Sequence, residues 1–245
     1  MKKNFTKAFL GLCALGTSAV AFAQDAAAPV IEQSFHQALK IKFIEGSAEF
    51  MSLVAIALIL GLAFVLERII YLNLADTNAD KLLKGVEAAL DKGDVEAAKA
   101  IARDTRGPIA SIFYQGLLRL DQGIDVVEKS VISYGGVQGG LLEKNLSWIT
   151  LFIAMAPSLG FLGTVVGMIM AFDKIEQVGD ISPTVVASGM KVALITTVGG
   201  LVVALILQVF YNYLLSKLEA ILNKMEDASI SLLDLVIKYN VKYNK

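Results

Sequence analysis

The stretch that decides the fold is APSLGFLGTVVGMIMAF, residues 156–172, inside a run from 145 to 172 without a charged residue. As an α-helix that run would be about 42 Å long, more than the roughly 30 Å of bilayer hydrocarbon. Gly160, Gly163 and Gly167 recur at i, i+3 and i+7, so they share one helix face. The spacing of Gly163 and Gly167 lets a second helix approach closely. Because Thr164 lies within this cluster, the pattern indicates a helix that lines a polar path rather than a lipid anchor.

The composition of the whole chain is that of a membrane protein. Of the 245 residues, 56% are hydrophobic and the mean hydropathy is +0.63, which is too apolar for a soluble domain. The net charge of −1 gives no basis for a nucleic-acid partner. His36 is the only histidine, which excludes a histidine-based metal site or triad within one chain. No phosphate-binding loop or nucleophile elbow is present, so we expect no enzymatic activity, metal or cofactor.

The first 23 residues have the layout of a secretory signal peptide. Three lysines stand within the first seven residues, residues 8–20 are apolar, and AFA at 21–23 is a small-x-small cleavage site. Cleavage would make Gln24 the first mature residue, and the alternative is an uncleaved anchor. Cys13, the only cysteine, would leave with the signal peptide.

Three segments are apolar enough to span a membrane: 50–72, 146–172 and 184–215. A cleaved signal leaves the N-terminus outside, and the basic residues favour the same topology, with Lys144 and Lys217 at the inner ends. We therefore predict an all-α integral membrane protein with three transmembrane helices, extended cytoplasmic helices and a cleaved signal peptide.

The same topology assigns the remaining segments. Residues 73–145 form a cytoplasmic helical domain, with helices over 80–91, from Asp94 to about 106, and over 109–120. A further helix from 124 is expected to run straight into the second span. Residues 216–245 are an amphipathic C-terminal helix that continues the third span into the cytoplasm. The periplasmic parts are residues 24–49, with an amphipathic helix over 30–46 on the membrane surface, and a loop over 173–183.

Hydroxyl groups at membrane depth are the candidate ion-pathway residues. They are Thr164, Thr196, Thr197 and Ser188. The plainer alternative is that each hydroxyl bonds back to a carbonyl of its own helix. Since no Asp or Glu lies in the middle of any span, a titrating carboxylate would have to come from another subunit.

Other residues of the spans are predicted to pack helices or to pair charges. The predicted packing residues are Pro157, Gly160, Gly163, Gly167, Gly199 and Gly200. Lys191 would be costly if buried, so it either extends to the outer headgroups or pairs with an acidic side chain.

The second span resembles the signature of the ExbB/TolQ/MotA proton-channel family, A-P-x-x-G-x-x-G-T-x-x-G-x-x-x-A-F. The matching residues are Ala156, Pro157, Gly160, Gly163, Thr164, Gly167, Ala171 and Phe172. Residues 193–212 resemble the family's A-L-x-x-T-x-x-G-L…Y-N helix, with the family threonine at Thr197. Two features depart from the family: Val192 stands where many enterobacterial relatives carry glutamate, and the proline after the third-span glycine is absent.

The resemblance implies a homopentamer of three-span subunits in the bacterial inner membrane, closest to ExbB. The ring would surround an ExbD-like single-span partner whose membrane aspartate carries the proton. A TonB-like protein would pass the force to outer-membrane transporters. The alternatives within the family are a TolQ-like envelope-maintenance stator and a motility stator. Outside it, the alternatives are a non-conducting scaffold and a secondary transporter, which would need a binding site and repeats that the sequence does not show.

Overall fold

The computed structural model describes residues 35–179 and 183–243. Throughout these residues the regular structure is helical and contains no strand. The chain divides into two units, Met1–Ile44 and Glu45–Lys245. The predicted signal peptide and residues 24–34 lie outside the described residues. The first described helix is α2 (Phe35–Glu45), which falls within the predicted N-terminal periplasmic segment.

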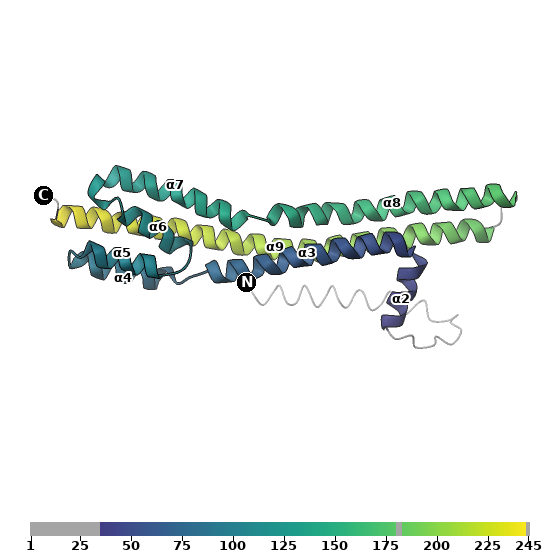
Figure 1. Cartoon of the computed structure of the whole chain (residues 1–245), viewed down its shortest axis with the longest axis horizontal. Helices are drawn as coiled ribbons and strands as arrows, with labels where there is room; N and C mark the ends of the chain where they lie inside the picture. The colour runs from purple at the N-terminus through teal and green to yellow at the C-terminus, as the bar shows by residue number, and fades with distance from the viewer. Residues whose placement is uncertain (1–34, 180–182, 244–245) are drawn as a thin grey trace, which may run out of the picture. The chain divides into compact units, whose positions relative to one another are not determined.

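Three long helices run through the second unit: α3 (Ala48–Ala75), α8 (Leu146–Val178) and α9 (Pro183–Tyr243). Each has the length and apolar composition needed to cross a membrane. In Figure 1, α8 and α9 lie side by side, and α3 packs along both. The prediction of an all-helical chain with three helices suited to span a membrane is confirmed for the described residues.

The ends of α8 and α9 differ from the predicted boundaries. Residues 173–178, predicted as loop, continue α8. The helix ends at Gly179, whose φ of 71° is the left-handed conformation that glycine adopts without strain, and whose N–H donates to the Ile175 carbonyl. A glycine cap therefore ends this helix, although charged residues begin already at Asp173. As predicted, α9 continues without interruption into the C-terminal helix.

Four shorter helices follow α3, close to their predicted positions: α4 (Ala79–Asp91), α5 (Val95–Asp104), α6 (Pro108–Leu117) and α7 (Ile124–Glu143), with a 3-10 turn at Leu120–Gln122 before α7. The Asn78 side chain accepts a hydrogen bond from the Lys81 N–H, and the Asp94 side chain accepts one from the Ala97 N–H. Both are N-caps, which supply acceptors to helix-start donors that have no partner within the helix. Pro108 begins α6, where its missing N–H costs nothing.

The prediction that α7 runs directly into α8 is wrong. The helix stops at Glu143, Lys144 is extended, and Asn145 has a φ of 68° before α8 begins at Leu146. Asparagine adopts this left-handed conformation more readily than most residues with a side chain. The glycine pairs at 135–136 and 139–140, expected to weaken the helix, lie inside continuous α7.

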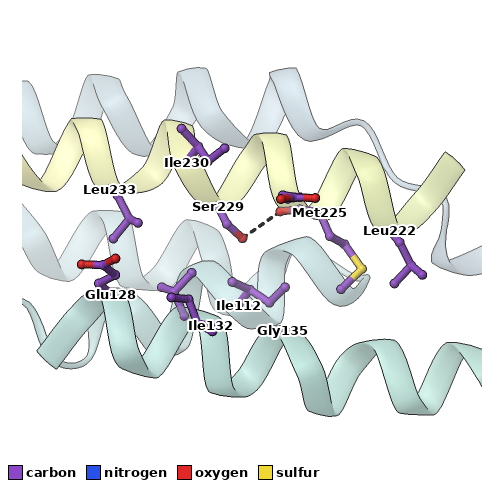
Figure 2. Close-up of a pocket in the computed structure, with 11 residues that line it drawn as sticks. Ile112, Glu128, Ile132, Gly135, Leu222, Met225, Ser229, Ile230 and Leu233 are labelled. Carbon is purple, nitrogen blue, oxygen red and sulfur yellow. Dashed lines mark hydrogen bonds between the residues drawn. The ribbon is translucent and has the colours of Figure 1, made fainter. Parts of the chain in front are cut away.

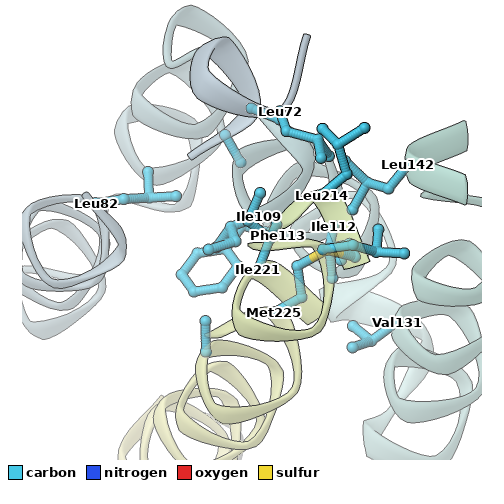
Figure 3. Packing of buried hydrophobic residues seen from close by; sticks show 14 of the residues in the cluster. Leu72, Leu82, Ile109, Ile112, Phe113, Val131, Leu142, Leu214, Ile221 and Met225 are labelled. Carbon is cyan, nitrogen blue, oxygen red and sulfur yellow. The ribbon is translucent and has the colours of Figure 1, made fainter. Parts of the chain in front are cut away.

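The core of the helical domain is centred on α6. Phe113 of α6 is fully buried, as are Ile109 and Ile112 on the same helix. Figure 3 shows α6 among residues of the surrounding helices, including Leu72, Val131, Leu142, Leu214, Ile221 and Met225. Full burial of such side chains contributes about 1.5–3 kcal/mol each. The C-terminal end of α3, helix α7 and the C-terminal half of α9 are therefore held together by one apolar helix.

Candidate functional site

Glycines allow the backbones of α8 and α9 to touch. A Cβ atom at Gly160 would lie 2.9 Å from the Thr196 carbonyl oxygen and 3.2 Å from the Thr197 Cα. From the other side, a Cβ atom at Gly200 would collide with the carbonyl oxygen of Ala156. Backbone atoms cannot turn away as a flexible side chain can, so any larger residue would separate the helices.

Two more glycines of α8 extend the same contact. Gly163 faces the side chain of Thr196, and a Cβ atom at Gly167 would lie 3.3 Å from the Ala193 nitrogen. Four of the predicted packing residues, Gly160, Gly163, Gly167 and Gly200, are thus buried between α8 and α9.

The other two predicted packing residues lie elsewhere. A Cβ atom at Gly199 would be 3.0 Å from the Met51 Cε, so Gly199 faces α3. Pro157 is half-buried inside α8, which continues through it.

Thr196 lies inside this contact. Its side chain has 0% of its surface exposed, and its hydroxyl donates to the carbonyls of Val192 (3.1 Å) and Ala193 (2.8 Å). Within one chain Thr196 therefore has no exposed surface, and its role in lining a pore between chains stays a prediction. In the single chain Thr196 is a packing residue.

The other three predicted pathway hydroxyls keep exposed surface. Thr164 and Thr197 are half-buried, and Ser188 is exposed. Each donates back to its own helix: Thr164 to the Phe161 carbonyl (2.6 Å), Thr197 to the Ala193 carbonyl (3.2 Å) and Ser188 to the Val185 carbonyl (2.8 Å). A hydroxyl that donates in this way still has lone pairs that accept from water or another group. Back-bonding therefore leaves Thr164 and Thr197 able to hold water.

Lys191 forms an ion pair with Glu45. Its Nζ lies 2.7 Å from the Glu45 Oε1, with 52% and 28% of the two side chains exposed. The sequence left two alternatives for Lys191, extension to the headgroups or pairing with an acidic side chain, and in the structure it pairs with an acidic side chain. The pair joins the N-terminal part of α9 to the residues just before α3.

Arg68 is a buried cation whose contacts the sequence did not reveal. Only 3% of its side chain is exposed. Its guanidinium donates to both oxygens of Glu67, from Nη2 at 2.6 Å and from Nε at 2.8 Å. Its Nη1 is 3.4 Å from the Leu142 carbonyl oxygen, in the last turn of α7, where carbonyls lack partners within the helix. The guanidinium also lies 4.6 Å from the centre of the Tyr71 ring.

The same group of side chains reaches the start of α8. The Asn145 side-chain amide donates to the Glu67 Oε2 at 3.3 Å. One turn earlier in α3, the ring of Phe64 stacks on Trp148 and Phe152, at 5.9 and 6.1 Å between ring centres. The C-terminal part of α3 thus holds both sides of the break between α7 and α8. An arginine at the end of an apolar run was the available sequence signal, but the Leu142 carbonyl that it contacts on α7 lies 74 positions away in the chain.

Ion pairs connect the C-terminal part of α9 to the end of α3 and to α4. Lys224 lies 2.6 Å from the Asp76 carboxylate, and Lys238 lies 3.4 Å from that of Asp91. The Asp91 carboxylate accepts a hydrogen bond from the Lys238 ammonium, and this bond together with the negative charge of Asp91 raises the pKa of Lys238. Each pair is partly exposed, so each contributes little stability on its own.

Comparison with known proteins places this arrangement in a family. A model of the MotA/TolQ/ExbB proton channel family matches residues 104–227, from the end of α5 through the glycine contact into the C-terminal half of α9. A biopolymer transport protein ExbB homolog of Methanothermobacter thermautotrophicus is 30% identical over 176 residues, 71% of this chain and 62% of the relative. The biopolymer transport protein exbB1 of Vibrio cholerae is 37% identical over 89 residues, 33% of this chain and 39% of the relative. For ExbB of Aquifex aeolicus the identity is 35% over 78 residues, 32% of this chain and 53% of the relative.

The fold and these matches define a multi-pass, all-helical membrane protein of a channel class. The chain belongs to the MotA/TolQ/ExbB proton channel family, and the relatives named above are ExbB-like. The matches cover less than two thirds of the length of each of these three relatives.

Proposed function

We propose that this protein is an ExbB-like stator subunit of a bacterial inner-membrane motor. It couples the proton motive force, through ExbD-like and TonB-like partners, to energised transport across the outer membrane. The observation that carries the proposal is the chemistry of the three spans. Their central parts hold hydroxyl groups at a tight glycine contact but no carboxylate.

Thr164 and Thr197 are the proposed pathway residues of this subunit. They lie at similar depth, because Gly163, next to Thr164, contacts Thr196, next to Thr197. Both keep exposed surface while Thr196 between the helices has none. Their hydroxyls relay protons through water but cannot store one, since a threonine hydroxyl does not titrate near neutral pH. The membrane aspartate of the partner supplies the titrating group, with its pKa raised by the dry surroundings.

The proposed assembly is a homopentamer that surrounds the spans of the partner. The N-terminus is periplasmic and the C-terminus cytoplasmic, with Lys144 and Lys217 at the inner membrane surface. In this topology the Arg68 group lies at the inner surface, and the Lys191–Glu45 pair lies at the outer one.

Proton flux into liposomes tests the proposal. The subunit alone is expected to conduct poorly, because apolar pores dewet readily and no carboxylate lies in the middle of its spans. Flux should appear when a single-span partner with a membrane aspartate is added. Thr164→Val and Thr197→Val keep the side-chain shape and should abolish that flux while the assembly survives. Thr150→Val is the matched control, since Thr150 also donates back along α8 but lies more than three turns before Thr164.

Three results would contradict the proposal. Strong flux from the subunit without any partner would mean that the titrating group is not supplied by the partner. Normal flux in both Val variants would remove Thr164 and Thr197 from the pathway. No flux under any condition, with the complex intact, would favour the non-conducting scaffold.

A further inference from the structure

A groove between α7 and α9 takes no part in the proposed ion pathway. It has a volume of about 480 Å³ and is lined by residues of α6, α7 and α9 (Figure 2). Its floor is apolar, with Ile112, Val131 and Met225 contributed by the three helices. Ile132 and Ile230 also line it, with 65% and 55% of their surface exposed. Since the groove lies outside the predicted spans, lipid does not account for this exposed apolar surface, which is typical of a protein contact.

The charges around the groove are of one sign. Glu128 of α7 and Glu226 of α9 line it, and no lysine or arginine does. Within the described parts of the chain, neither carboxylate takes part in an ion pair. The Ser229 hydroxyl, on the α9 side of the groove, donates its hydrogen bond to the Met225 carbonyl at 2.7 Å, so it does not donate to an occupant (Figure 2). Two unpaired carboxylates beside an apolar floor favour an occupant with both apolar and cationic side chains.

The dimensions of the groove suit a short helix. Its α9 wall runs from Leu222 to Leu233, which is about 16 Å along a helix, or three turns. A helix of that length presents apolar side chains at i, i+4 and i+7 to such a floor. The same groove on a second copy of this chain is a less suitable occupant than a cationic helix. Two grooves that face each other across a two-fold axis would bring four carboxylates together.

We propose that this groove binds an amphipathic, cationic helix of a partner protein. The apolar face of that helix lies on Ile112, Val131 and Met225. Its lysine or arginine side chains pair with Glu128 and Glu226. The proposal is independent of the ion pathway, because none of these residues lies in a predicted span.

Fluorescence anisotropy with a designed peptide tests the groove in the full-length protein. The probe is a labelled helical peptide of about 14 residues, with leucines at i, i+4 and i+7, alanines elsewhere and two lysines at each end. The protein is held in nanodiscs of phosphatidylcholine, whose neutral headgroups do not attract the lysines. Empty nanodiscs and a peptide with glutamates in place of the lysines are the controls for the probe.

Adjacent glycines of α7 provide a matched pair of variants. A Cβ atom at Gly135, which lines the groove, would meet only the Ile112 Cδ1, at an ordinary contact distance of 3.9 Å, so Gly135→Leu is expected to place its side chain in the groove. Gly136 does not line the groove and has nothing within 4 Å, so Gly136→Leu is its control. Both changes replace a helix-interior glycine with a better helix former, which keeps α7 folded.

The expected result is saturable binding of the lysine peptide to the wild-type protein. Gly135→Leu should weaken this binding roughly tenfold or more, and Gly136→Leu by less than about twofold. Glu128→Gln combined with Glu226→Gln should weaken binding about tenfold and remove most of its salt dependence. Glu143→Gln, an exposed carboxylate of α7 outside the groove, should have no such effect.

Several outcomes would overturn the proposal. Equal binding by wild type and Gly135→Leu would mean that the peptide binds elsewhere. Equal binding of the glutamate peptide would remove the role of the two carboxylates. Absence of binding, together with a smaller oligomer for Gly135→Leu by native mass spectrometry, would assign the groove to a contact between copies of this chain.

Discussion

Gly163 of α8 and Thr196 of α9 fit together so closely that a Cβ atom at position 163 would lie 2.8 Å from both Cβ and Oγ1 of the threonine. Thr196 cannot turn away, because its hydroxyl is held by carbonyls of its own helix and the side chain is fully buried. The pair therefore sets how closely α8 and α9 approach within one chain.

The first prediction concerns this contact. Gly163→Ala should destabilise the protein by about 1–3 kcal/mol, because the added methyl group forces the helices apart. Thermal unfolding of the purified protein in detergent measures the effect. Ala154→Leu, at an exposed position of the same helix, is the control and should change little. The penalty of Gly163→Ala should shrink when Thr196→Gly removes the opposing side chain, and an unchanged penalty would contradict the contact.

A second prediction concerns Arg68. Arg68→Met keeps much of the side-chain volume but leaves Glu67 unpaired and the Leu142 carbonyl without its donor. Because Glu67 is 44% exposed and keeps the Asn145 amide, the main loss is the donor to the Leu142 carbonyl, and a destabilisation of about 1–3 kcal/mol with a lower unfolding temperature is expected. Arg103→Met removes an arginine that is 65% exposed, and it should stay within about 0.5 kcal/mol of wild type. Similar stability of the two variants would show that the Arg68 contacts contribute little.

A third prediction separates backbone strain from hydrogen bonding at Asn145. Both Asn145→Gly and Asn145→Val lose the hydrogen bond to Glu67, but only valine is strained at a φ of 68°. The valine variant should therefore be less stable than the glycine variant by at least about 1–2 kcal/mol, the cost of the left-handed conformation. Chemical or thermal unfolding of both variants measures the difference. Equal stabilities would mean that α7 and α8 can join as one helix in the variant.

A fourth prediction concerns the pair of Lys191 and Glu45. Because the lysine is half exposed, a double-mutant cycle with Lys191→Met and Glu45→Gln should give a coupling energy of only about 0.2–1 kcal/mol. Raising the salt concentration should reduce it further. A coupling of several kcal/mol would instead indicate that the pair is shielded from solvent, for example by a neighbouring subunit.

Much of this protein could be predicted from local patterns in the sequence. Uncharged runs long enough for a bilayer identified the three long helices, because hydrophobic length is a property of contiguous residues. The caps at Asn78, Asp94 and Pro108 mark helix ends through interactions within one turn. The spacing of Gly160, Gly163 and Gly167 also predicted a close helix contact, since three helical positions define a face.

Only the tertiary structure decided which residues from distant parts of the sequence contact one another. It places Thr196 inside the helix contact and leaves surface on Thr164 and Thr197, although all three are threonines in apolar spans. It also breaks the chain at Asn145, where contacts from Glu67 and Arg68 hold the ends of two helices that local propensity would have joined. Hydrophobic periodicity reports the burial of a face, whereas the rotation of one helix against another depends on side chains that lie far apart in sequence.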